Sequence, residues 1–318
     1  MNNFEQNMRS ILLGKKSESE IVAFLEDINH SGLTANQVKL GVDIMRENMT
    51  GINIPNAIDI VGTGGTGLKT LSISTAVSIV SAGAGAKVAK HGNRAASSLT
   101  GTADTLSYLG VNLNIKSDKI IECVERCGVG FLFAPNHHPA MRFVASARKL
   151  IGKRTIFNLL GPMSNPAQTK RMLVGVCDDN WRRLMSEAFN RLNVEHVWVV
   201  HGHDGLDEIT TTGLSNISEV KNGKISNFTL DPREFGIKTV EIDKLKGGKP
   251  DQNATALMNL LNGSKGPYRD IVRLNSGVSL MISGMTDTIE NGIMMATESI
   301  DSGAAKNTLQ QLVTISNE

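Results

Sequence analysis

The sequence predicts an α/β fold with a large domain, built on a mostly parallel mixed sheet flanked by helices, and a small all-α domain. Three observations lead to this prediction. Short apolar strand patterns alternate with helical patterns from residue 58 to residue 200. The first 50 residues carry apolar side chains at helical spacing and no strand pattern. The length of 318 residues is more than one small core needs and is typical of two domains.

The N-terminal segment is predicted to form three short amphipathic helices. Ser17 or Ser19 and Thr34 are suitable N-cap residues, because their hydroxyl groups accept hydrogen bonds from the first free N–H groups of a helix. Gly32 is a suitable stop between the second and third helices. The apolar clusters that predict the three helices are Ile11–Leu12, Ile21–Ile28 and Val38–Met45.

The strand and helix patterns alternate after residue 57. Strands are expected at Ile58–Val61, Lys87–Ala89, Phe131–Phe133, Leu173–Val176 and Val197–Val200. Helices are expected at Ser72–Ala84, Thr102–Leu109, Asp118–Cys127, Pro139–Leu150 and Trp181–Leu192. This alternation indicates parallel strands that are covered on both faces. The segment Pro139–Leu150 is placed to return and pack beside the N-terminal helices.

The C-terminal third changes pattern twice. Residues 209–242 are rich in Thr, Ile and Val, with turn signals at Asn222-Gly223 and Asp231-Pro232, and this predicts hairpin-like excursions. The last 70 residues are predicted to be helical, and glycines divide them into three or four segments. These glycines are Gly263, Gly284 and Gly303.

Charge and cysteine content narrow the class of protein. The 33 basic and 31 acidic residues leave a net charge of +2, which is too small to attract nucleic acid or a membrane surface. No stretch approaches the apolar length of a membrane span, and the polar N-terminus lacks a secretion signal. The three cysteines have no framework spacing, and Cys123 and Cys127 are interpreted as neighbours on one helix face. We therefore expect a soluble, cytoplasmic protein.

A glycine-rich loop, Gly62-Thr63-Gly64-Gly65-Thr66-Gly67, lies between the first predicted strand and the next helix. Successive backbone N–H groups in such a loop bind anions, helped by the helix N-terminus. A dinucleotide fold would need an acidic residue about 20 positions later, but none occurs between Asp59 and Asp104. A Walker A loop is excluded because Leu68 separates Gly67 from Lys69. The loop is interpreted as a phosphate cradle, with hydroxyl groups from Ser72, Ser74 and Thr75 that cap the helix or donate to phosphate.

A basic loop follows the second predicted strand. Its sequence, Lys90-His91-Gly92-Asn93-Arg94, supplies two positive charges, an imidazole and an amide, and Ser97, Ser98 and Thr100 add hydroxyl groups. Ligands of open α/β sheets bind at the carboxyl ends of the strands. Two adjacent strands that both end in anion-binding loops therefore predict one shared phosphate site.

An acidic pair, Asp207-Glu208, closes a glycine-rich turn after the strand Val197–Val200. Hard carboxylate ligands suit Mg²⁺, which keeps several waters and is completed by substrate phosphates. Two acids in a surface turn are more often simply solvated, so the pair alone leaves both interpretations open. Zinc is rejected for the neighbouring His201-Gly202-His203-Asp204, because the sequence has no further ligand cluster.

Six motifs in this order resemble anthranilate phosphoribosyltransferase, within the nucleoside phosphorylase/phosphoribosyltransferase-like superfamily. The resemblance runs from about residue 57 to residue 236. The motifs are Gly62–Gly65, Ser74-Thr75, Lys90–Arg94, Ala134-Pro135 through Met141, Arg154–Pro162, and His201-Gly202 with Asp204–Glu208.

The resemblance implies the reaction and its cofactor. The 5-phosphoribosyl group of 5-phosphoribosyl-1-pyrophosphate (PRPP) would pass to the amine of anthranilate, releasing pyrophosphate, in the second step of tryptophan biosynthesis. Mg²⁺, two ions per site, would assist, and the chain would form a homodimer. The small helical domain would comprise residues 1–57 and 137–166, and the large α/β domain residues 58–136 and 167–318.

The resemblance also assigns site residues. PRPP would contact Gly62, Gly65, Thr66, Thr70, Ser72, Ile73, Ser74, Thr75, Lys90, His91, Gly92, Asn93, Arg94, Ala95, Ala96, Ser97, Ser98 and Thr102. Anthranilate would contact Gly62, His91, Asn93, His138, Arg148 and Pro162, whereas His137 is expected to be a capping or core residue. Magnesium ligands would be Ser74, Asp207 and Glu208. Lys90 would act electrostatically, and no residue would act as a covalent nucleophile.

Two departures and two alternatives qualify this assignment. Thr66 stands where the family commonly has Asp, and Ser72 where it commonly has Asn, which affects PRPP affinity and the number of bound metal ions. One alternative is a pyrimidine-nucleoside phosphorylase-like glycosyltransferase, which would not need Asp207 and Glu208. The other is a non-catalytic nucleic-acid-binding relative, which would carry a basic stripe that this near-neutral sequence lacks.

Overall fold

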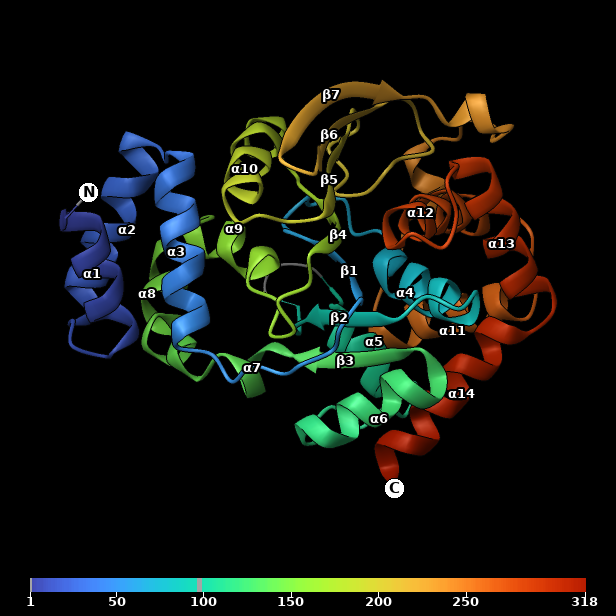
Figure 1. The fold of residues 1–318 in the computed structure, drawn as a ribbon, viewed down its shortest axis with the longest axis horizontal. Coiled ribbons are helices and arrows are strands. Elements are labelled where there is room, and N and C mark those ends of the chain that lie inside the picture. Colours follow the sequence, from blue (N-terminus) through green and yellow to red (C-terminus); the bar gives the residue numbers. More distant parts are fainter. Residues whose placement is uncertain (1, 96–98) are drawn as a thin grey trace.

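The computed structural model describes residues 2–95 and 99–318 (Figure 1). Three helices form its N-terminal part: α1 (Asn2–Leu12), α2 (Glu18–Ser31) and α3 (Ala35–Glu47). Ser17 caps α2 and Thr34 caps α3, each in a capping box, and Gly32 ends α2 with a φ of 80°. These three helices and their boundaries confirm the prediction from the sequence.

A seven-stranded sheet in the order β3-β2-β1-β4-β5-β6-β7 forms the centre of the fold. The first five strands are parallel, and the last two add antiparallel to β5. The strands are β1 (Ile58–Gly62), β2 (Val88–Gly92), β3 (Val129–Phe133), β4 (Arg171–Gly175), β5 (His196–Gly202), β6 (Ser215–Lys221) and β7 (Lys224–Leu230). The predicted mixed, mostly parallel sheet is confirmed, as is the hairpin that turns at Asn222-Gly223.

Helices cover both faces of the sheet, as Figure 1 shows. Because strand side chains alternate between faces, Ile58 and Ile60 pack with α4 and the C-terminal helices, whereas Met172 and Val174 pack with the N-terminal helices. The helices are α4 (Ile73–Gly83), α5 (Thr102–Tyr108), α6 (Ser117–Cys127), α10 (Asp179–Arg191), α11 (Pro250–Leu261), α12 (Pro267–Ser283), α13 (Ile289–Asp301) and α14 (Ala304–Asn317). The fold therefore has two main cores, one on each face.

The segment before β4 differs from the prediction in detail. The single helix expected over Pro139–Leu150 is divided into a 3₁₀ turn, Pro139–Phe143, and helix α8, Ala145–Ile151, after the short helix α7, Ala134–His137. A residue before proline is disfavoured in the helical region, and His138 accordingly has a ψ of 65°. Helix α8 packs against α2, which confirms the expected return.

Helix α9 (Ile156–Met163) lies in the segment 137–166 that the resemblance assigns to the helical domain, but no pattern of residues in the sequence locates it. It contains Pro162 one residue before its end. Proline lacks the N–H group that a helix interior uses, so its presence argues against a helix in the sequence pattern. The helix ends immediately afterwards, so little helix follows the lost hydrogen bond.

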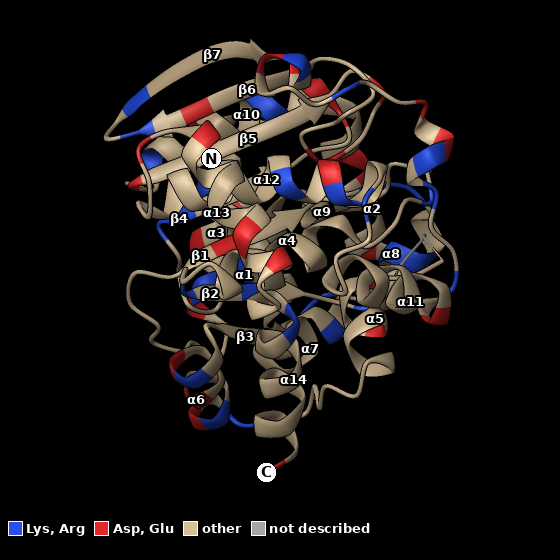
Figure 2. Ribbon diagram, turned by 90° about the vertical axis from the view of Figure 1, so that its right-hand side faces the viewer, with Lys and Arg blue, Asp and Glu red and all other residues tan. Residues whose placement is uncertain are grey.

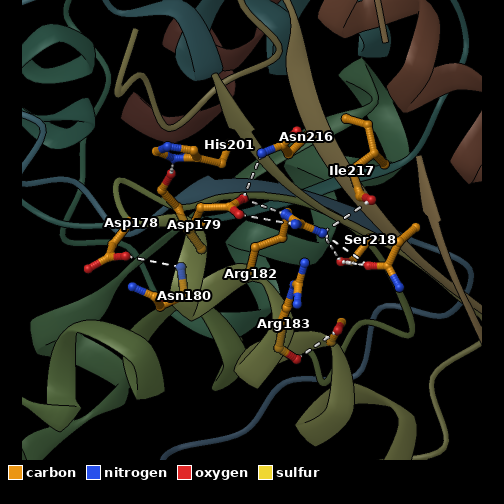
Figure 3. Close-up of polar contacts among 12 residues, drawn as sticks. Asp178, Asp179, Asn180, Arg182, Arg183, His201, Asn216, Ile217 and Ser218 are labelled. Atoms are coloured by element: carbon orange, nitrogen blue, oxygen red, sulfur yellow. Dashed lines mark hydrogen bonds and ion pairs between the residues drawn. The ribbon is translucent and has the colours of Figure 1, made fainter. Parts of the chain in front are cut away.

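Arg182 connects helix α10 to the antiparallel strands β6 and β7 through hydrogen bonds (Figure 3). The residue is 4% exposed, and its guanidinium donates to the Asp179 carboxylate over 2.6 Å and to the Asn227 side chain over 3.0 Å. Asn216 donates to the same carboxylate over 3.2 Å. A buried guanidinium needs such partners, because an unpaired charge in the interior is costly. The contacts fix the position of β6 against α10.

Charged residues are interspersed over the fold. In the view of Figure 2, Lys and Arg positions are scattered among Asp and Glu positions. Neighbouring charges on helices also pair, as Arg126 does with Glu122 on α6. Among the described residues, no helix has the length and apolar character that crossing a membrane requires.

Candidate functional site

A cavity of about 840 Å³ opens at the carboxyl ends of the parallel strands, between the sheet and helices α8 and α9. Every site residue predicted above that the structure describes lines this cavity; Ala96, Ser97 and Ser98 lie outside the described residues. The lining residues among them are Gly62, Gly65, Thr66, Thr70, Ser72, Ile73, Ser74, Thr75, Lys90, His91, Gly92, Asn93, Arg94, Ala95, Thr102, His138, Arg148, Pro162, Asp207 and Glu208.

The glycine loop borders one side of the cavity. Gly64, Gly65 and Gly67 have φ values of 65°, 74° and 75°, a region that other residues rarely adopt. Thr63 fixes the start of the loop by donating its N–H to the Gly175 carbonyl over 2.9 Å. Arg154 fixes its middle by donating to the Gly65 carbonyl over 2.6 Å. The loop is thus held in a conformation that turns backbone toward the cavity.

The turn after β5 presents the acidic pair. Asp204 shapes this turn, since its carboxylate accepts hydrogen bonds from the Thr210 hydroxyl over 2.7 Å and from the Leu206 N–H over 2.9 Å. Asp207 then lies against the ends of β1 and β4. A side chain at Gly175 would overlap the Asp207 carbonyl, and one at Gly62 would overlap its carboxylate. Both glycines are required by this close approach.

Both residues of the acidic pair have raised pKa values. Burial raises the pKa of Asp207, although the Gly64 N–H donates to its carboxylate over 2.8 Å. Burial and the Asp207 charge raise the pKa of Glu208 well above its usual value, and the nearby Lys90 charge opposes this. Two desolvated neighbouring carboxylates favour a cation between them. The donor set of two carboxylates and the Ser74 hydroxyl fits Mg²⁺.

Lys90 enters the cavity from β2. Its ammonium donates to the Ile60 carbonyl over 2.6 Å and to the Ser74 hydroxyl over 3.3 Å. Burial lowers the pKa of Lys90 to about 8, while the Asp59 and Glu208 charges act in the opposite direction. Lys90 and Glu208 therefore lie in one cavity, close enough to interact, as a shared pyrophosphate site requires.

The opposite side of the cavity carries aromatic rings and a guanidinium. The His91 and His138 ring centroids lie 5.1 Å apart, and burial is the main cause that lowers the pKa of each imidazole, which favours the neutral form of both rings. Arg148 lies over the Phe157 ring and donates to the Asn158 side chain over 3.5 Å. No carboxylate of the described residues forms an ion pair with Arg148. The guanidinium remains available for an anionic ligand.

The two positions that depart from the family pattern use their hydroxyl groups within the protein. The Ser72 hydroxyl caps no N–H of α4 but bonds to the Thr105 hydroxyl over 2.8 Å and to the Asn253 amide over 3.3 Å. The Thr66 hydroxyl accepts the Leu68 N–H over 3.2 Å. Neither hydroxyl replaces the carboxylate or amide that the family pattern leads one to expect.

Sequence reasoning missed several residues that line the cavity, among them Met141, Arg142, Phe157 and Asn158. Met141, Phe157 and Asn158 lie within the motifs quoted above, so the family resemblance could have identified them. Arg142 gave none, because an exposed arginine in a short turn has no distinguishing pattern. His137 is confirmed as a core residue: it is buried, and its Nδ1 lies 2.8 Å from the Thr50 carbonyl oxygen.

Comparison with known proteins agrees with this geometry. The profile of the glycosyl transferase family, a/b domain, matches residues 54–306. The anthranilate phosphoribosyltransferase of Parvibaculum lavamentivorans is 48% identical over 308 residues, which cover 96% of this chain and 90% of the relative. The crystal structure of the Thermus thermophilus enzyme superposes with a TM-score of 0.93 at 37% identity, covering 100% of this chain and 95% of the other.

Two yeast structures carry ligands. The Saccharomyces cerevisiae anthranilate phosphoribosyltransferase in complex with PRPP and Mg has a TM-score of 0.90 and 27% identity, and the complex with 4-fluoroanthranilate has a TM-score of 0.88 and 26% identity. Each alignment covers 99% of this chain and 92% of the yeast chain. With the cavity, its acidic pair and these similarities together, the chain belongs to the anthranilate phosphoribosyltransferase family of glycosyl transferases.

Proposed function

We propose that this chain transfers the 5-phosphoribosyl group of PRPP to the amine of anthranilate, releasing pyrophosphate, as the second step of tryptophan biosynthesis. One observation carries the proposal. The glycine loop, Lys90 and the acidic pair Asp207-Glu208 face the same cavity that Arg148 and the two histidines line from the other side. A phosphate-binding half thus adjoins a half suited to a small aromatic anion.

The phosphate half would hold PRPP and stabilise its leaving group. The glycine-loop N–H groups and the Lys90 ammonium would donate to the pyrophosphate, whose negative charge grows as the bond to the ribose carbon breaks. Ser74, Asp207 and Glu208 would hold Mg²⁺, which supplies additional positive charge to the pyrophosphate oxygens. The anomeric carbon gains positive character in such displacements. No covalent intermediate with the protein is required.

The aromatic half would orient the nucleophile. Arg148 would pair with the anthranilate carboxylate through its planar donor fork, while His91, His138 and Pro162 would lie beside the ring. An aryl amine is neutral near pH 7, so it attacks without prior deprotonation and loses its proton after the bond forms. Orientation, together with exclusion of water, would supply much of the rate.

Four finer proposals accompany this function. We propose two Mg²⁺ per site, one on the acidic pair and one carried by PRPP itself. We propose that residues 1–57 and 137–166 form a small domain that closes over the large domain, residues 58–136 and 167–318. We propose that the protein works in the cytoplasm, where its three free cysteines would stay reduced. We also propose a homodimer, for which light scattering should give twice the chain mass of 34.2 kDa.

The function is tested by the loss of anthranilate fluorescence when the protein meets anthranilate, PRPP and Mg²⁺. We expect the signal to fall only when all three are present. A parallel reaction with thymidine and inorganic phosphate examines the nucleoside phosphorylase alternative. Thymine release without loss of anthranilate fluorescence would overturn the proposed function.

Replacing Arg148 with Ala should raise the KM for anthranilate roughly 10- to 100-fold, because a hydrogen bond to a charged group contributes about 1.5–3 kcal/mol. The KM for PRPP should change far less, since Arg148 lies on the aromatic side of the cavity. Lys149→Ala is the matched control, as Lys149 is exposed and outside the cavity. Steady-state kinetics with each substrate varied would measure both constants, and equal increases would contradict the assigned role.

A further inference from the structure

Strands β1 and β2 separate toward the cavity. Within these two fully described strands, the register pairs only Ile58 with Val88, whereas β2 and β3 pair over five residues, from Val88 with Val129 to Gly92 with Phe133. The glycine loop leaves the end of β1, and the basic loop leaves the end of β2. The gap between the two strands therefore sets the distance between the two loops.

Asp59 bridges this gap. It is 0% exposed, and because strand side chains alternate, it points to the opposite face from Ile58 and Ile60. Its carboxylate accepts the His91 N–H over 3.1 Å, in place of a backbone carbonyl of β1. Lys90 spans the same gap, donating to the Ile60 carbonyl over 2.6 Å. Side chains thus satisfy backbone groups that the separated strands leave unpaired.

Asn165 holds Asp59 from the other side. It is 1% exposed, and its amide nitrogen donates to the Asp59 carboxylate over 2.7 Å and to the Ala89 carbonyl over 2.8 Å. Its amide oxygen accepts the Ala167 N–H over 2.7 Å. Asn165 therefore contacts both β1 and β2, and all of its polar side-chain atoms are bonded. A buried, fully bonded network of this kind fixes one geometry.

The network also lies where the chain crosses between the helical part and the sheet. Asn165 follows α9 and precedes β4, and the next residue, Pro166, accepts the Ile52 N–H over 3.1 Å. Ile52 belongs to the other crossing, between α3 and β1. The hydrogen bond between Ile52 and Pro166 thus links the α3–β1 segment to the α9–β4 segment beside the gap.

We propose that Asp59 and Asn165 are a positioning pair that fixes the separation between β1 and β2 and so sets the spacing between the two loops that bind PRPP. The inference rests on the proposed function, because it deepens the account of the PRPP site. Neither side chain lines the cavity, so the pair acts through the loops and not through contact with substrate.

The test uses Asp59→Asn and Asn165→Leu in the full chain. An amide at position 59 keeps the shape but cannot accept from both the His91 N–H and Asn165, and Leu at position 165 removes both donors. We expect the KM for PRPP to rise at least about tenfold and the KM for anthranilate to stay within about twofold. A split of this kind would not follow from general destabilisation.

Val199→Ala is the control for destabilisation. Val199 is buried in β5 outside the cavity, so its loss should lower the melting temperature and leave both KM values unchanged. The exchanged pair, Asp59→Asn with Asn165→Asp, keeps a hydrogen bond between the two side chains and loses the one to Ala89. We expect it to recover part of the PRPP affinity lost in the single variants.

Amide hydrogen exchange separates this inference from the proposed function. Exchange at His91 and in residues 62–67 should quicken about tenfold or more in Asp59→Asn, whichever substrate the cavity takes. Unchanged exchange, or a PRPP KM within about twofold of the wild-type value in both single variants, would overturn the positioning role. Absence of activity in the wild-type protein would instead overturn the proposed function.

Discussion

Changing Asp207 to Asn together with Glu208 to Gln is expected to lower turnover at least about 10³-fold, because a catalytic metal supplies several kcal/mol to the transition state and about 1.36 kcal/mol corresponds to tenfold in rate. Both side chains are half-buried in the cavity wall, and burial raises the pKa of each, so a bound cation would offset the cost of keeping both carboxylates ionised. The amides keep the shape of the turn but cannot neutralise Mg²⁺. Initial rates across a Mg²⁺ titration would measure the loss.

A matched control is another adjacent acidic pair, Asp178 and Asp179, at the start of α10. Changing both to Asn removes the same two charges outside the cavity. This control should melt at a lower temperature, because Asp179 pairs with the buried Arg182, but its turnover should stay close to that of the wild-type protein. If the Asp207 and Glu208 variant kept its turnover and its Mg²⁺ dependence, the metal site would lie elsewhere.

Replacing Lys90 with Gln should lower turnover roughly 10²- to 10³-fold, the usual cost of losing one preorganised group that stabilises developing charge. Glutamine keeps a polar N–H donor on this side chain, one bond shorter than the Lys90 ammonium that donates to the Ile60 carbonyl. The variant loses the positive charge that faces Glu208 and the proposed pyrophosphate site. Steady-state rates at saturating PRPP and anthranilate measure the effect on turnover.

Lys87→Gln is the control for this prediction. Lys87 directly precedes the same strand but is exposed and outside the cavity, so its replacement should leave turnover unchanged. Thermal melting of both variants would show whether the fold persists. A Lys90→Gln enzyme that turned over within about threefold of wild type would remove Lys90 from the electrostatic account.

The parts of the site that depend on local chemistry were predictable from the sequence. The glycine loop could be recognised from a short stretch of sequence, because glycines readily adopt the left-handed conformations found at Gly64, Gly65 and Gly67. Lys90 was predictable because the carboxyl ends of parallel strands meet at one edge of a sheet. The alternation of strands and helices was sufficient for the large sheet, and the capping residues Ser17 and Thr34 for the first helices.

The parts that depend on distant partners were not predictable. Asp59 stands within an apolar strand pattern, and its role is apparent only beside Asn165, which lies 106 residues further along the chain. Helix α9 was missed because Pro162 argues against a helix, although tertiary packing overrides that local preference near the helix end. Arg142 lines the cavity because of where the turn Pro139–Phe143 lies in the fold, and the sequence around it carries no pattern that predicts this position.

The contact between Gly175 and the Asp207 carbonyl has a consequence for protein engineering. The carbonyl occupies the space that the first carbon of any side chain at position 175 would need. Directed-evolution libraries that aim at altered substrates should therefore leave codon 175 untouched and vary residues on the aromatic side of the cavity. Even alanine there should push the turn that carries Asp207 and Glu208 outward and lower activity without altering a single polar group.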